Sequence, residues 1–318
     1  MTYKPEPEKE VHLDVVRDVV KEASGRDAKG INKIEEGFEN EVYIVSTESG
    51  EDVVVRVRRK GDTEFRQESW AIEKSSEAGA PVAEVLLLKR VAHDGENLEV
   101  MVQEKLNGTP LENVKDDLSE QERDVILLKA GEAIAKIHSV SVEGSGQRKE
   151  DGSWEYPDWK SYMETFIATR REETDLLLDA GLTENEIQSA LSALEQYRAY
   201  DDMDSVLCHG DFMPRHVMVD REKQEVGIID FGLFRGNVPF FDLAYFQLNA
   251  PKEQIAPLLA GYEKRRKLGK DSERKLILAK LHLVVKHLAK LAHPYRKHRR
   301  DEIPHWLDVL RVTLAELE

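Results

Sequence analysis

The stretch LCHGDFMPRHVMVD (207–220) sets titratable side chains between apolar segments. His209, Asp211 and His216 lie inside it. Burying such groups is costly unless each finds a partner, so a polar turn and a catalytic loop are the two interpretations open to this stretch alone. A carboxylate in a catalytic loop can orient a hydroxyl and accept its proton, which makes Asp211 a candidate catalytic base.

A second acidic motif follows at a defined distance. Asp230, Phe231 and Gly232 come directly after the strand-like segment VGII. A carboxylate at the end of a strand supplies the hard oxygen ligand that Mg²⁺ prefers. His216 follows Asp211 by five positions, which is the Asp-to-Asn spacing of the phosphotransfer pattern H-x-D-x-x-x-x-N. The two motifs together predict a site for a nucleotide, with Mg²⁺ or Mn²⁺, and for a hydroxyl acceptor.

The elements that must position these motifs form two groups with different hydrophobic patterns. Up to Leu106 the chain predicts a mostly antiparallel sheet with helices at 10–24 and 63–80, and strands within 31–61, 82–91 and 98–106. Beyond it, helical spacing dominates at 119–140, 160–181, 183–200 and 273–293, with a loop at 141–159. We therefore predict an α+β fold of two lobes. Residues 1–106 would bind nucleotide, residues 107–318 would carry the catalytic and acceptor-binding groups, and the ligand cleft would lie between them.

Composition narrows the class of protein. The 318 residues are 40% hydrophobic and carry a net charge of −16, which favours a globular chain and disfavours nucleic-acid binding. No apolar run is long enough for a membrane span, and the N-terminus lacks the apolar core of a signal peptide. A single cysteine fits a reducing cytoplasm. Residues 251–318 nevertheless hold 16 Lys and Arg against 9 Asp and Glu, so this basic segment is either a solvated helix face or a dock for an anion or for a second subunit.

With these motifs in place, the chain resembles the aminoglycoside phosphotransferase and choline kinase family, the small-molecule relatives of protein kinases. The resemblance covers nearly the whole chain in the correct order. EEGFENEVYIV matches the hairpin that covers the nucleotide, VVVRV the phosphate-pairing strand and MVQEKLNGTPL the hinge, while CHGDFMPRHVMVD and GIIDFGLFRGNVPFFDLAYF match the two catalytic segments. The glycine of HGD, and the absence of a long activation segment after DFG, favour small-molecule kinases over protein kinases.

The resemblance implies a role for each matched residue. Asp211 would be the catalytic base, Asp230 and His216 the metal ligands, and His209 and Asp242 the residues that hold the catalytic loop. Glu68 would anchor the phosphate-pairing side chain, Gln103 would be the gatekeeper, and the backbone of Glu104 and Leu106 would bind the adenine edge. The residues implied in nucleotide binding are Gly37, Val42, Arg56, Glu68, Gln103, Glu104, Leu106, Met218 and Ile229.

Two positions depart from the family pattern. Arg56 stands where the family has a phosphate-pairing Lys, and Arg58 lies on the same face of that strand. Arg is permanently charged and can bind phosphate oxygens with two donors, so the role survives the change. His216 stands where the pattern has Asn, as it does in macrolide kinases and one branch of aminoglycoside kinases.

These features predict a kinase that transfers the γ-phosphate of ATP or GTP to a hydroxyl of a small molecule. An aminoglycoside, a macrolide or a related metabolite is the expected acceptor, and the protein would be a monomer or homodimer. The alternative is a nucleotide-binding pseudokinase with a scaffold role. Aminoglycosides are polycations that need an acidic pocket, whereas the C-terminal helices are basic.

Three further features have simpler interpretations. Cys208 is expected to be a buried packing residue, and the spacing of His282, His287 and His293 does not place two ligands on one helix face. The aromatic residues Trp154, Tyr156 and Trp159 either line the acceptor pocket or pack the 141–159 segment onto the body.

Overall fold

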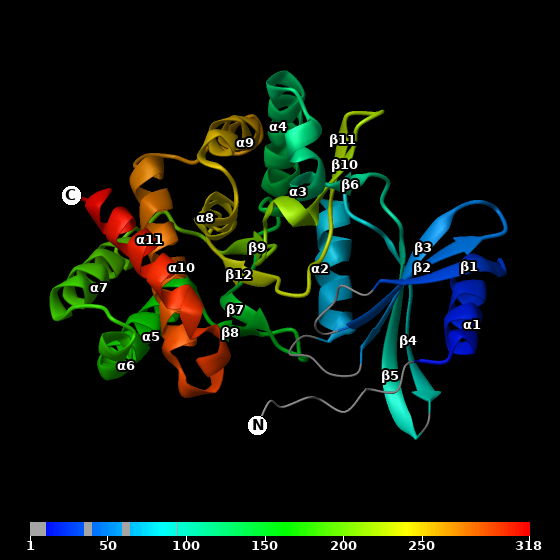
Figure 1. The fold of residues 1–318 in the computed structure, drawn as a ribbon, viewed down its shortest axis with the longest axis horizontal. Coiled ribbons are helices and arrows are strands. Elements are labelled where there is room, and N and C mark those ends of the chain that lie inside the picture. The colour runs from blue at the N-terminus through cyan, green and yellow to red at the C-terminus, as the bar shows by residue number, and fades with distance from the viewer. Residues whose placement is uncertain (1–10, 35–39, 59–63, 94) are drawn as a thin grey trace.

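The computed structural model describes residues 11–34, 40–58, 64–93 and 95–318. A sheet of five strands forms one part of the molecule and a mainly helical region forms the rest, as Figure 1 shows. The predicted α+β, two-lobed kinase-like fold is thereby confirmed, while the division at residues 106 and 107 stays a prediction. Within the described ranges, no helix is both long and apolar enough to cross a bilayer.

The five-stranded sheet is antiparallel, in the order β1-β2-β3-β5-β4. Its strands are β1 (Ala28–Ile34), β2 (Asn40–Thr47), β3 (Asp52–Arg58), β4 (Val85–His93) and β5 (Glu96–Glu104). Side chains on β3 alternate between buried valines and more exposed positions, the period-2 pattern of a strand. The valine face is covered by α1 (Leu13–Ser24), whose Val16 and Val20 join it in one apolar core.

Helix α2 (Phe65–Glu77) links the sheet to the helical region. It lies between the two parts in Figure 1, and its Ala71 and Ile72 belong to the large core of the helical region. Glu68 on the same helix is buried. The position of α2 is therefore fixed by packing on one side and by a charged contact with the sheet on the other.

The helical region is built around long amphipathic helices. Helix α4 (Glu120–Ile137) begins with a capping box in which Ser119 and Glu122 bond each other's backbone N–H groups. The remaining helices are α3 (Leu111–Val114), α5 (Trp159–Glu172), α6 (Thr174–Asp179), α7 (Glu184–Arg198), α8 (Phe240–Asn249), α9 (Ile255–Glu263), α10 (Ser272–Ala292) and α11 (Ile303–Ala315). Short 3₁₀ turns occupy Lys115–Asp117 (η1), Pro214–His216 (η2), Lys252–Gln254 (η3) and Pro294–Glu302 (η4).

Two small sheets lie among these helices and position the two sequence motifs. One has the order β11-β10-β6 and the other β8-β7-β12-β9. Their strands are β6 (Thr109–Pro110), β7 (Ser145–Arg148), β8 (Trp154–Tyr156), β9 (Val206–Cys208), β10 (Val217–Asp220), β11 (Glu225–Ile228) and β12 (Arg235–Asn237).

Two expectations from the sequence need correction. The segment 141–159 is not all loop, because β7 and β8 form a hairpin within it. The short strand β7 lacks apolar alternation and is held by pairing with the distant β12, a contact that local patterns do not contain. The helix expected at 160–181 is two helices, α5 and α6, that meet at Glu173.

Candidate active site

The first motif forms a loop between β9 and η2. Gly210 in this loop has φ 85°, and a Cβ there would come 1.8 Å from the backbone oxygen of Leu233. No other residue fits this position without moving one of the two segments. The glycine thus allows the segment after Asp230 to pack directly against the loop that carries Asp211.

His209 is completely buried and holds both segments through its ring. Its Nε2–H donates to the backbone oxygen of Ile229 at 2.9 Å, and its Nδ1 accepts the backbone N–H of Asp211 at 3.3 Å. This pair of bonds requires the neutral Nε2–H tautomer. Burial lowers the pKa of His209, which favours that neutral form.

Asp242, in the first turn of α8, binds the backbone of the loop that carries Asp211. Its carboxylate accepts the backbone N–H groups of His209 at 2.6 Å and Gly210 at 2.9 Å, and it lies 3.0 Å from Nε2 of His138. Burial acts to raise the pKa of Asp242, but the hydrogen bond and charge of His138 outweigh it and the pKa is lowered. The loop is therefore held by an ionised carboxylate inside the core.

Three groups that can ligate a metal meet at the surface of this loop. One oxygen or nitrogen atom from each of Asp211, His216 and Asp230 lies within 4.8 Å of the others. The Nδ1–H of His216 donates to the backbone oxygen of Asp211 at 2.8 Å, and its Nε2 accepts the Nε–H of Arg215 at 3.1 Å. This Nε2 lies 3.4 Å from Oδ2 of Asp230. Two acceptor atoms facing each other at this distance, with two carboxylates in the set, fit a divalent cation.

Asp230 itself adopts an unusual backbone conformation. Its φ is 69°, in the left-handed region that Asp tolerates better than most residues. The carboxylate is 48% exposed and lies 3.7 Å from a guanidinium nitrogen of Arg56. Although burial acts to raise its pKa, the charge of Arg56 outweighs it and the pKa is lowered. The strained backbone thus presents an ionised carboxylate next to a fixed cation.

Arg56 and Arg58 share a strand face but have different partners. Arg56 pairs with the buried Glu68 of α2, and its Cζ lies 5.2 Å from the ring centre of Phe65. Arg58 is bound at 2.9 Å by Glu99 of β5. Only Arg56 therefore has its charge beside Asp230.

A cavity of about 540 Å³ lies in front of these groups, between the five-stranded sheet and the loop that carries Asp211. The residues implied by the sequence that line it are Val42, Arg56, Gln103, Glu104, Leu106, Asp211, Met218, Ile229 and Asp230. Four others, His209, His216, Asp242 and Glu68, lie behind the lining and contact it through the bonds given above. Gly37 lies outside the described residues.

Sequence reasoning missed two residues beside Asp211. Arg215 lines the cavity, with Nη2 3.5 Å from Oδ2 of Asp211 and Nε 3.1 Å from Nε2 of His216. Tyr245 of α8 lies on the other side of the loop, where burial and the Asp211 carboxylate raise its pKa. Arg215 could have been found from its place between the two motif residues. Nothing local in the sequence marks Tyr245.

The remaining sequence candidates lie elsewhere. Cys208 is buried, with a pKa raised well above its usual value by burial, as its apolar neighbours predict. His282 is buried with Nε2 3.0 Å from the hydroxyl of Tyr162, and Trp159 is buried against Tyr197. His293 is exposed and His287 is half-buried in the same helical region.

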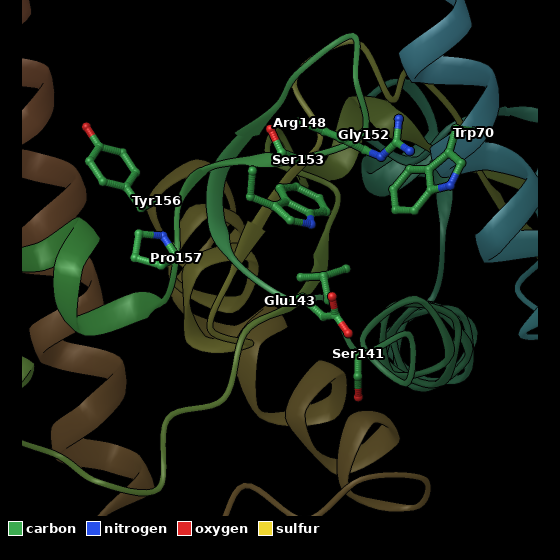
Figure 2. Close-up of a pocket in the computed structure, with 10 residues that line it drawn as sticks. Trp70, Ser141, Glu143, Arg148, Gly152, Ser153, Tyr156 and Pro157 are labelled. Atoms are coloured by element: carbon green, nitrogen blue, oxygen red, sulfur yellow. The ribbon is translucent and has the colours of Figure 1, made fainter.

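Trp154 and Tyr156 line a second cavity of about 530 Å³ at the β7–β8 hairpin, away from Asp211. In Figure 2, Arg148 from the hairpin lies against Trp70 of α2, with Cζ 4.2 Å from the ring centre. Arg148 also donates to Gln67 of α2. The hairpin therefore contacts α2, the helix that carries Glu68, through Arg148.

Comparisons with known proteins give one family match. The family model described as the phosphotransferase enzyme family matches residues 30–276. No curated protein matches the chain.

Solved structures share the fold at low identity. A thermostable mutant of aminoglycoside phosphotransferase APH(4)-Ia in its apo form has 18% identity and a TM-score of 0.67, over 94% of this chain and 98% of that one. A putative fructosamine-3-kinase from Thermobifida fusca YX-ER1 has 18% identity and a TM-score of 0.63, over 93% and 100%. Macrolide 2'-phosphotransferase MphH from Brachybacterium faecium has 18% identity and a TM-score of 0.61, over 94% and 97%.

Proposed function

Since the chain belongs to the phosphotransferase enzyme family, we propose that it transfers the γ-phosphoryl group of ATP or GTP to a hydroxyl of a small molecule. The observation that carries this proposal is the meeting of Asp211, His216 and Asp230 beside Arg56 at a cavity large enough for a nucleotide. Phosphoryl transfer requires little covalent chemistry from the protein, so positioned charges of this kind supply most of the catalysis.

The nucleotide would lie in the cavity of about 540 Å³. Met218 and Ile229 would form the apolar floor for the base, with Gln103 as gatekeeper and the backbone of Glu104 and Leu106 at the edge of the base. Arg56, oriented by Glu68, would hold phosphate oxygens with its guanidinium group. This role falls to Arg56 and not to Arg58, because Arg56 lies beside Asp230 whereas Arg58 pairs with Glu99 of another strand.

Asp230 and His216 would hold a divalent cation, Mg²⁺ or Mn²⁺. When bound, such a cation neutralises charge on the phosphate oxygens. His216 would present Nε2, since its Nδ1–H donates to the backbone of the catalytic loop. Asp230 would present a carboxylate oxygen from its left-handed backbone position.

Asp211 would act on the acceptor. Its carboxylate would orient the acceptor hydroxyl and accept the hydroxyl proton as the new bond from oxygen to the γ-phosphorus forms. The bond from that phosphorus to its bridging oxygen breaks at the same time, and the nucleoside diphosphate leaves. Arg215, 3.5 Å from Asp211, would stabilise negative charge on the phosphoryl group in transfer.

The similar structures include an aminoglycoside phosphotransferase in complex with ADP and hygromycin B, a macrolide 2'-phosphotransferase and a putative fructosamine-3-kinase. The test is therefore a nucleotide-consumption screen across aminoglycosides, macrolides and hydroxylated metabolites, with ATP and GTP in parallel and Mg²⁺ as the cation. Acceptor-dependent formation of nucleoside diphosphate, lost in Asp211→Asn, is the expected result. Nucleotide binding without transfer to any acceptor would instead favour a pseudokinase.

A further inference from the structure

Two cationic side chains lie over one aromatic ring beside the catalytic loop. The Cζ of Arg235 is 5.2 Å and the Nζ of Lys286 is 5.6 Å from the ring centre of Phe241. Arg235 begins β12, where the register places it opposite Cys208 of β9, and Lys286 comes from α10. Two elements far apart in the sequence therefore bring like charges to one aromatic ring.

Neither cation is neutralised by the part of the chain that the structure describes. Among those residues, no carboxylate oxygen lies within 4.0 Å of a side-chain nitrogen of Arg235 or Lys286, which is the distance limit for an ion pair. The Nε–H of Arg235 donates to the backbone oxygen of Leu233 at 3.4 Å. Its terminal Nη groups have no hydrogen-bond acceptor among the described residues.

The surroundings of Lys286 disfavour its charge. Burial, followed by the charges of Arg235 and Lys290, lowers its pKa well below the usual value. Arg170 adds to this effect, and the exposed Glu155 opposes it. Half-buried like charges without a counter-ion raise the free energy of the folded chain, so the arrangement favours binding of an anion.

This pair of cations lies close to the catalytic carboxylate. The ring of Phe241 stacks on Tyr245 with ring centres 6.3 Å apart. Tyr245 interacts with Asp211 as well as with Arg235, so contacts through Tyr245 and Phe241 connect Asp211 to the two cations. The cations therefore lie near the place where the acceptor hydroxyl would bind.

We propose that Arg235 and Lys286 form an anion subsite for the acceptor, which is then a small hydroxylated carboxylate or phosphate ester. The inference rests on the proposed phosphotransferase function and deepens it by naming the class of acceptor. An anionic group would neutralise both cations through charge-assisted hydrogen bonds. A polycationic aminoglycoside would instead meet repulsion at this place.

The direct test is calorimetric titration of the full chain with inorganic phosphate, acetate and neutral acetamide, after saturation with ADP and Mg²⁺. We expect binding of at least one anion and none of acetamide. Preference for phosphate indicates a phosphate ester, and preference for acetate a carboxylate. Arg235→Gln and Lys286→Gln should each weaken anion binding by roughly tenfold or more, while Lys252→Gln, an exposed lysine in η3, should not.

Thermal unfolding provides the control for folding. Removal of one of two repelling cations should raise the melting temperature of Lys286→Gln in the absence of anions, so lost binding cannot be assigned to an unfolded variant. Anion binding that is absent, or unchanged in both variants, overturns the subsite. If ADP and Mg²⁺ themselves fail to bind in the first step, the proposed function fails instead.

Discussion

The Nε2 of His216 lies 3.4 Å from Oδ2 of Asp230 and accepts the Nε–H of Arg215 at 3.1 Å. Because the Nδ1–H of His216 donates to the backbone oxygen of Asp211, Nε2 is the ring nitrogen that faces Asp230 as an acceptor. A cation bound here would replace the Arg215 N–H as the partner of Nε2. The predictions for Asp230 and His216 test this site directly.

Asp230→Ala should abolish Mg²⁺-dependent nucleotide binding, because it removes the main anionic oxygen ligand. Calorimetry of ATP binding with and without Mg²⁺ measures the effect. The control is Asp220→Ala, which removes a carboxylate at the far end of β10. Unchanged affinity of Asp230→Ala for the magnesium nucleotide would contradict the assignment.

His216→Asn should keep activity with Mg²⁺ and lower the activity with Mn²⁺ relative to that with Mg²⁺, since an amide oxygen is harder than an imidazole nitrogen. His216→Ala should lose activity with either cation. Rates with both cations, measured for both variants, give the comparison. If His216→Ala remains as active as the wild-type chain, His216 is no metal ligand.

Arg148→Met should weaken nucleotide binding several-fold with a smaller effect on turnover. The change removes the contact with Trp70 and the hydrogen bond to Gln67, worth about 1 to 2 kcal/mol together. Helix α2 then holds Glu68, and through it Arg56, less firmly. KM for the nucleotide and kcat should be compared with those of Lys149→Met, an exposed neighbour; equal values for the two variants would refute the coupling.

The ion pair of Lys275 and Asp202 predicts a pH-dependent stability. Lys275 is almost fully buried, and its Nζ lies 2.6 and 2.7 Å from the two oxygens of Asp202. The hydrogen bond from Lys275 lowers the pKa of Asp202. A lowered folded-state pKa stabilises the fold above the unfolded value of about 4, and this contribution is lost as the pH falls through the folded value.

Asp202→Asn should therefore lower the free energy of unfolding by about 1 to 2 kcal/mol at pH 7, a modest figure because the carboxylate is 60% exposed. The difference from the wild-type chain should shrink as the pH falls below about 4. Denaturant unfolding at several pH values measures it. Asp201→Asn, whose carboxylate is 90% exposed, is the control and should show little change at any pH.

Local motifs predicted that Asp211, His216 and Asp230 would lie close together, and the roles assigned to them stay predictions. Asp211 and Asp230 follow apolar strands at a fixed spacing, but the loop of Asp211 is also held by Ile229 and Asp242 from other segments. The strand alternation that put Arg56 and Arg58 on one face could not separate them, because the difference lies in Glu99 of another strand. The two-lobed fold followed from the change of hydrophobic period near Leu106.

What the sequence did not predict depends on contacts between distant elements. The hairpin of β7 and β8 needs β12, and the cation pair needs Arg235 and Lys286 to meet at Phe241. Tyr245 faces Asp211 only because α8 packs under the catalytic loop. Neither composition nor periodicity carries this information, since each contact joins residues whose own segments look ordinary.

The central claim is that Asp211 is the catalytic base, and the most direct test is phosphoryl transfer by Asp211→Asn to an acceptor found in the screen, together with its affinity for the magnesium nucleotide. The account predicts that turnover falls by on the order of 10² or more while nucleotide affinity and melting temperature stay close to those of the wild-type chain. Turnover near the wild-type rate in a folded, nucleotide-binding Asp211→Asn variant would contradict it.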